Sequence, residues 1–182
     1  MYRAGHLGMA LIWTLPALLL GYLTAGVAAT ILLSVTAVAV ASLPDWDQRI
    51  PIVSHRGFSH TIWFAGLITA ITTAGALTFW PQIASLLFEH EPYPETVQSL
   101  ATIQPQIAAG LIGSTVLLSL LSHIFADSLT VGSGKYGIQP VWPLSRRELR
   151  FGYCRADSTV WNYGLLLTGS LLYGLFLWIL VN

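Results

Sequence analysis

The stretch LGMALIWTLPALLLGYLTAGVAATILLSVTAVAVASL, residues 7–43, contains no charged residue and decides the fold class. A membrane-spanning helix needs about 20 mostly apolar residues, and this run is long enough for two of them. Gly21 and Gly26 allow a tight turn in its middle. We therefore expect two spans, 7–23 and 25–43. One long helix, or a hairpin with a shallow tip, is the alternative.

The composition of the whole chain agrees with a membrane protein. Of 182 residues, 54% are hydrophobic and only 9% are charged, whereas soluble domains are about one-quarter charged. A soluble fold of this length could not hide so much apolar surface. The spans must be helices, because isolated strands would leave backbone groups unpaired in lipid. We predict one all-α domain, residues 1–182, a polytopic transmembrane helix bundle of about five spans at 7–23, 25–43, 61–80, 107–126 and 160–181, with a loop cap at 127–159.

The distribution of Lys and Arg predicts the orientation of this bundle. Arg3 precedes the first span, Arg49 and Arg56 lie between the second and third, and the other five basic residues lie between the fourth and fifth. With five spans, all of these segments share one side of the membrane, while residues 81–106 carry no Lys or Arg. By the positive-inside rule, we expect a multi-pass protein of the inner (cytoplasmic) membrane with its N-terminus in the cytoplasm and its C-terminus outside.

The net charge bears on which partners the chain binds, and the cysteine content bears on which covalent links and metal sites it can form. The formal net charge is +0, so we expect no nucleic-acid partner, and membrane lipid is the expected surrounding. The single cysteine, Cys154, excludes an internal disulfide and a cysteine-based zinc site. We interpret it as an inert packing residue.

Histidines and aspartates gather near the predicted cytoplasmic face. His123 and Asp127 are four residues apart at the end of the fourth span, so their side chains project from one helix face and can bind one cation. Other helix ends bring further donors to the same side. Imidazole and carboxylate ligands suit zinc, with manganese or iron as alternatives, and their number suits one or two ions. The candidate metal ligands are His6, Asp45, His55, His60, His123 and Asp127.

Each of these residues, taken alone, is more simply a helix cap or an interfacial anchor. Ionisable groups at membrane depth are costly, however, and their collection at one face of a chain so poor in charge indicates a metal or catalytic role. Asp47 either acts in catalysis or only orients a ligand, and His55 either binds metal or fixes the tautomer of a neighbour. Arg56, within the ligand loop, is either a positive-inside charge or a bidentate partner for phosphate.

These motifs resemble those of the YdjM-like family of membrane-bound, metal-dependent hydrolases. The resemblance covers roughly residues 1–155. It is carried by His6 and by the segments LPDWD (43–47), HRGFSHT (55–61), SHIFADSLT (122–130) and YGIQPVWPL (136–144).

That family is more distantly similar to zinc-dependent phospholipases C and P1-type nucleases. The resemblance implies a principal metal site of His123, Asp127, Asp45 and one of His55 or His60, with His6 and Asp127 serving a second ion. Those soluble enzymes have further His and Glu ligands after the His-x-x-x-Asp helix. In this chain no His follows His123, and Glu148 is the only later Glu.

The expected activity is metal-dependent hydrolysis of a phosphoester, of the phosphodiesterase or phospholipase type, on a lipid headgroup at the cytoplasmic face. Asp45 or Asp47 would take the proton of water, and Arg56 would bind the phosphate. Lys135, Arg146 and Arg147 would shape an entrance for the anionic substrate.

Two other classes of function are considered. The first is a non-catalytic metal-binding membrane protein that acts as a sensor, scaffold or regulator. The second is a transporter, which ranks last because transport needs polar groups at mid-bilayer and the spans carry only scattered Thr and Ser there.

Overall fold

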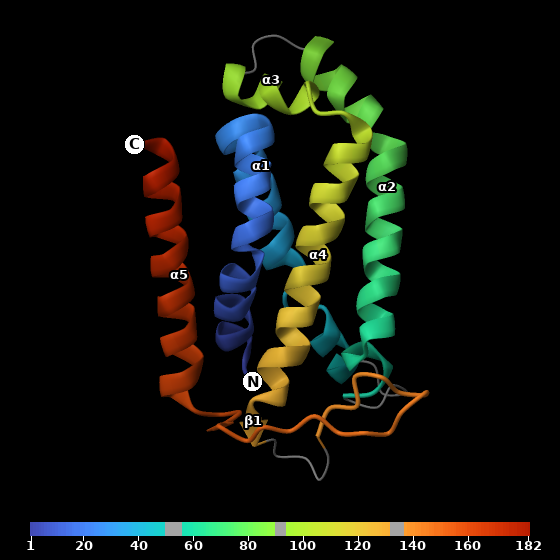
Figure 1. The fold of residues 1–182 in the computed structure, drawn as a ribbon, viewed down its shortest axis with the longest axis vertical. Helices are drawn as coiled ribbons and strands as arrows, with labels where there is room; N and C mark the ends of the chain where they lie inside the picture. Colours follow the sequence, from blue (N-terminus) through green and yellow to red (C-terminus); the bar gives the residue numbers. More distant parts are fainter. Residues whose placement is uncertain (50–55, 90–93, 132–136) are drawn as a thin grey trace.

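The computed structural model describes residues 1–49, 56–89, 94–131 and 137–182. Within these ranges the chain is a helical bundle, as Figure 1 shows. This confirms the predicted all-α fold. The helices are α1 (Arg3–Val40), α2 (Ile62–Glu89), α3 (Glu95–Ala101), α4 (Pro105–Ser128) and α5 (Thr159–Val181), with two short 3₁₀ helices, η1 (Pro44–Arg49) and η2 (Phe58–His60).

Helix α1 reverses its direction at Ala25 and Gly26, whose backbone angles leave the helical region. Gly26 has a φ of 64°, a conformation that only glycine adopts without steric cost from a Cβ. The reversal frees backbone carbonyls from the helical ladder, and the hydroxyl of Ser99 in α3 donates to the carbonyl of Ala25 at 3.0 Å. The turn expected near Gly26 is therefore present and is covered by α3.

The two arms of α1 lie against each other as a hairpin. Leu18 in the first arm and Leu33 in the second belong to one buried cluster, and Leu33 occupies the space beside Gly21. In Figure 1 the blue chain rises from the N-terminus and then returns to the same end. The expected helices 7–23 and 25–43 are thus present as the two arms of a hairpin, and one continuous straight helix is not what the structure shows.

Four described segments are long and apolar enough to cross a membrane, and the first of them contains both arms of the hairpin. α4 packs between α1 and α2, and α5 packs against α1. In α4, 56% of the most apolar window is buried, against 6% in α2 and in α5. The exposed apolar faces of α2 and α5 are therefore the surfaces that lipid would cover. The four segments are Arg3–Arg49, Ile62–Phe88, Pro105–Ser128 and Thr159–Leu180.

The bundle has two different ends. The start of α1, η1, η2 and the segment between α4 and α5 meet at the lower end in Figure 1, whereas α3 and the C-terminus lie at the upper end. The segments that carry Arg3, Arg49 and Arg56 thus share an end. Which end faces the cytoplasm remains a prediction.

α2 extends beyond the predicted span 61–80 and continues through Pro81 to Glu89.

The predicted cap at 127–159 contains local order. β1 (Thr130–Val131) pairs in parallel with β2 (Cys154–Arg155), and Ile138 forms an antiparallel bridge with Leu149. These pairings hold the segment across the lower end of α4. Lys135 and His55 lie outside the described residues.

Candidate metal centre

Five ionisable side chains meet at the lower end of the bundle, each delivered by a different turn of helix. His6 lies in α1, Asp45 in η1 and His60 at the end of η2, while His123 and Asp127 lie near the end of α4. The three histidines are fully buried and Asp127 is 2% exposed. The side chain of Asp45 retains 21% exposure. Among the five, Asp45 therefore faces the open side of the cluster.

The distances between the donor atoms are those of ligands around a single cation. His6 Nε2 lies 3.3 Å from Asp127 Oδ1 and 3.7 Å from Asp45 Oδ2. His123 Nε2 lies 3.6 Å from Asp45 Oδ1. Two ligand atoms that are each about 2.1 Å from a tetrahedral zinc ion lie about 3.4 Å apart. The spacing of this cluster therefore fits a divalent metal ion.

His60 extends the cluster by a third imidazole. Its Nε2 lies 3.4 Å from Asp127 Oδ2, 3.7 Å from Asp45 Oδ1 and 3.4 Å from His123 Nε2. Single donor atoms of His6, Asp45, His123 and Asp127 all lie within 4.8 Å of one another. Two nitrogens and two oxygens form a complete zinc-type set. His60 stands beside it as a further candidate ligand.

Hydrogen bonds behind the cluster orient two of the imidazoles. His123 Nδ1 lies 2.7 Å from the carbonyl oxygen of Ala41, which accepts its proton and leaves Nε2 to face Asp45. On the far side of His60, Nδ1 lies 3.0 Å from Ser59 Oγ and 3.4 Å from Asp47 Oδ2. The hydroxyl of Ser59 donates to the same carboxylate oxygen at 2.5 Å. Metal-binding histidines typically have such an outer partner, and this geometry favours the orienting role for Asp47.

The carboxylates also set the charge of His60. Burial disfavours its protonated form, but hydrogen bonding to Asp127, Asp45 and Asp47 outweighs burial and raises the pKa of His60 to about 10. Without a cation, the carboxylates thus favour the protonated form of His60, which balances part of their negative charge. A divalent ion at the same place would take over this role and release the proton.

Arg56 joins the cluster from the loop before η2. Its Nε lies 3.6 Å from Asp127 Oδ2, and its Nη2 donates to Thr130 Oγ1 at 3.4 Å. The backbone of Arg56 has a φ of 62°, which is uncommon for a residue with a side chain. The amide of Arg56 donates to Asp47 Oδ2 at 3.2 Å, which helps to hold this conformation. Arg56 is therefore fixed next to a candidate metal ligand.

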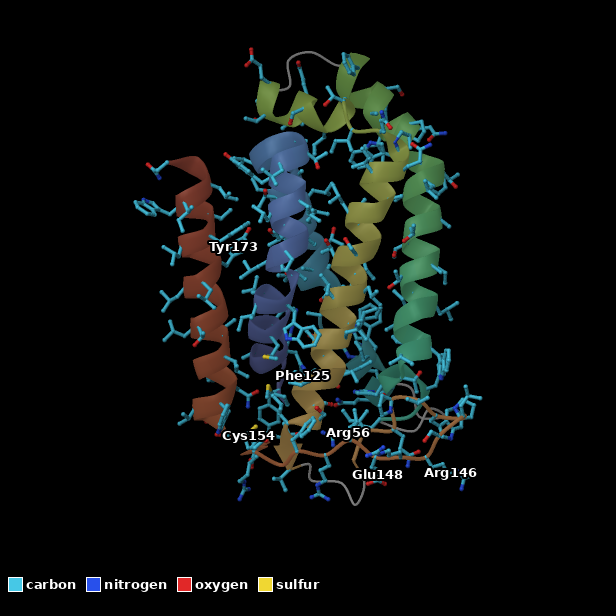
Figure 2. All side chains as sticks on the ribbon, viewed as in Figure 1. Arg56, Phe125, Arg146, Glu148, Cys154 and Tyr173 are labelled. Carbon is cyan, nitrogen blue, oxygen red and sulfur yellow. The ribbon has the colours of Figure 1, made fainter. Side chains whose placement is uncertain are left out.

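The structure does not bring all of the predicted site residues together. Arg146 and Arg147 are exposed in the cap, and Figure 2 shows Arg146 well apart from Arg56. His55 and Lys135 lie outside the described residues. The entrance predicted from the cap residues therefore remains a prediction.

Contacts at the start of the chain were not foreseen from the sequence. The carbonyl oxygen of Met1 lies 3.0 Å from His6 Nε2, and the amino group of Met1 contacts Asp127 Oδ1. Asn162 in α5 accepts a hydrogen bond from the backbone of Tyr2. Backbone donors and acceptors are present at nearly every position, so residue types carry no signal for them.

The comparisons with known proteins concern the chain as a whole. A family model described as YdjM inner membrane protein matches residues 1–181. No curated protein and no solved structure gives a significant match. The family match covers every element that contributes to the cluster.

Proposed function

For this chain, which belongs to the YdjM inner membrane protein family, we propose the function of a metal-dependent hydrolase that cleaves a phosphoester in a lipid headgroup at the cytoplasmic face. One observation carries the proposal. Three imidazole Nε2 atoms and two carboxylates converge at 3.3 to 3.7 Å, and one of these carboxylates is open to the outside. Buried ionisable groups in a membrane protein usually mark function.

The residues would have two roles, holding the cation and acting on the substrate, and Asp45 would serve in both. His6, Asp45, His123 and Asp127 would hold the ion, and His60 is the next donor. A bound divalent ion lowers the pKa of a water ligand to near neutrality and polarises phosphoryl oxygens. Asp45 is the candidate for accepting the proton of the attacking water, because its side chain is the most exposed of the cluster.

Arg56 supplies the group that recognises phosphate. Its guanidinium carries five N–H donors, and the contacts with Asp127 and Thr130 involve two of its nitrogen atoms. The remaining donors can bind phosphoryl oxygens with charge-assisted hydrogen bonds. The cluster lies at the end of apolar helices, the depth at which lipid headgroups lie. A phosphate-bearing lipid therefore fits the position of the site.

The same cluster also supports a non-catalytic role as a metal-binding sensor, scaffold or regulator. The specific observation is burial, since His6, His60 and His123 have no exposed surface. Structural metal sites are closed, whereas catalytic sites keep a position open for water or substrate. The accessibility of the metal on the Asp45 side is what separates these two functions.

The deciding experiment measures metal content and turnover on the same protein. Purified protein in nanodiscs is loaded with zinc or manganese and offered phospholipids and soluble phosphodiesters. We expect metal-dependent product release, which Asp45→Asn abolishes. Asp157→Asn is the matched control, because Asp157 is an exposed carboxylate that pairs with Arg155 in the cap. Bound metal without turnover would support the sensor role, and no bound metal would reject both.

A further inference from the structure

Asn162 is a buried amide that joins α5 to the first residues of the chain. It lies in the first turn of α5 and is 1% exposed. Its side-chain nitrogen donates to the carbonyls of Ala156 and Ser158 at 2.9 and 2.8 Å. Its Oδ1 accepts from the backbone N–H of Tyr2 at 2.8 Å. Three hydrogen bonds in different directions fix the orientation of this side chain.

Tyr2, whose N–H is held by Asn162, is also hydrogen-bonded to His6. The carbonyl of Tyr2 accepts from the backbone N–H groups of Gly5 and His6, at 3.0 and 3.2 Å, and so begins helix α1. The peptide of Tyr2 is thus held by Asn162 at its N–H and holds His6 at its carbonyl. The preceding carbonyl, that of Met1, lies 3.0 Å from His6 Nε2. Because Nε2 is also the atom that faces the cluster, a bound ion would replace its contact with Met1. The link from Asn162 that a bound ion would leave intact runs through Tyr2 to the backbone of His6.

The close approach of the helices leaves no free space at this contact. A Cβ on Gly5 would lie 2.7 Å from Asn162 Oδ1, closer than real Cβ contacts allow. A Cβ on Gly8 would lie 2.3 Å from the carbonyl oxygen of Leu165. Glycines at helix contacts in membranes allow backbones to approach this closely. The start of α1 is consequently held in register with α5.

We propose that Asn162 is a positioning residue of the metal centre, which holds His6 in ligand geometry from helix α5. This inference rests on the proposed metal site. It extends that site to the last helix, which contributes no donor atom to the cluster among the described residues. Outer partners of metal ligands typically change metal affinity by about 10- to 100-fold when they are removed.

The test compares three variants of the full chain in nanodiscs, using zinc competition titration and the visible absorption of bound Co²⁺, which reports coordination geometry. Asn162→Ala should lower zinc affinity by roughly 10-fold and alter the Co²⁺ spectrum. Asn162→Asp keeps the acceptor for Tyr2 but loses at least one donor to Ala156 or Ser158. It should keep the wild-type spectrum while losing thermal stability.

Tyr173→Phe is the matched control for the docking of α5. Its hydroxyl lies 2.6 Å from Ser34 Oγ and also joins α5 to α1, but Figure 2 shows it far above Arg56 and the lower end. We expect this variant to keep both affinity and spectrum. If Asn162→Ala does not fold, Gly5→Ala provides a second route, because its Cβ would meet Asn162 Oδ1 at 2.7 Å as well as the flexible side chain of Met1 at 2.3 Å.

The outcomes separate positioning from general loosening of the helices. Wild-type affinity and spectrum in Asn162→Ala would overturn the proposal, as would an equal loss of affinity in Tyr173→Phe. Turnover is not part of the readout. A chain that binds zinc and hydrolyses nothing would refute the hydrolase, whereas the same metal measurements on Asn162→Ala would still decide this inference. A wild type that binds no metal would refute both.

Discussion

His6 Nε2 lies 3.7 Å from Asp45 Oδ2, although the hairpin of α1 separates the two residues in the sequence. A straight helix of the 38 residues in α1 would be about 57 Å long. The contact therefore exists only because the chain reverses at Ala25 and Gly26. Closure of the hairpin at its upper end brings together two candidate metal donors at its lower end.

From this relationship we predict that the candidate metal centre depends on Gly26. Gly26→Ala should destabilise the protein by about 1–3 kcal/mol, because a φ of 64° with a ψ of −147° lies in a region that is essentially restricted to glycine. Gly66→Ala is the control, since at both positions a Cβ would have nothing within 4 Å. Thermal unfolding in detergent measures the loss of stability, and zinc titration measures the loss of metal affinity. Equal stability of both variants would show that the reversal does not need glycine.

The donor set predicts which substitutions remove the metal. His123→Ala and Asp127→Ala should each lose bound zinc, because each removes a donor from a buried four-membered group. Affinity should fall in acid, since histidine must be neutral to bind. Metal analysis of the purified protein gives the stoichiometry, with Asp157→Ala as an exposed control. Full metal content in both variants would place the metal elsewhere.

Much of this fold follows from the sequence because lipid imposes simple rules. Apolar runs of sufficient length predicted the helices, and the four-residue spacing of His123 and Asp127 predicted a shared helix face. Helix α2 is longer than the predicted span 61–80 and continues through Pro81 to Glu89, because a span counts only the apolar length that lipid requires. Asn162 was missed because an apolar pattern gives no signal for one amide that binds a backbone group.

The raised pKa of His60 predicts how the metal-free protein responds to pH. A raised pKa contributes stability that is fully present below the ordinary value of 6.5 and is lost as the pH rises through about 10. In a chelator, thermal stability should therefore fall across this range. Asp47→Asn should reduce the fall, because Asp47 is one of the three carboxylates responsible. If the thermal stability of the metal-free wild type did not change with pH over this range, the raised pKa of His60 would be contradicted.

The crossing of α1 and α5 predicts a sharp difference between two glycines. Gly8→Ala should cost about 1–3 kcal/mol, because its Cβ would meet the backbone of Leu165 at 2.3 Å. Gly174→Ala, where a Cβ would have nothing within 4 Å, should be neutral or stabilising by up to about 1 kcal/mol. Unfolding in mixed micelles measures both. If both substitutions changed the free energy of unfolding equally, α1 and α5 would not be in tight contact at Gly8.

Arg56 offers the sharpest test of phosphate recognition, and its backbone decides which variant to use. Because its φ is 62°, Arg56→Ala would combine loss of the guanidinium with backbone strain. Arg56→Gly accepts this conformation and removes the side chain alone. We expect zinc to remain bound, because Arg56 supplies no ligand atom and the cluster keeps its four donors.

Turnover of a phosphate-bearing lipid should fall by roughly 100-fold in Arg56→Gly, the loss expected when a donor to developing charge is removed. Arg56→Lys should recover only part of it, because an ammonium cannot form the two parallel hydrogen bonds of a guanidinium. The measurement is kcat/KM for phospholipid and for a neutral ester in the same nanodiscs. If both substrates are affected equally, Arg56 acts through Asp127, which lies 3.6 Å away, and phosphate is not what it recognises.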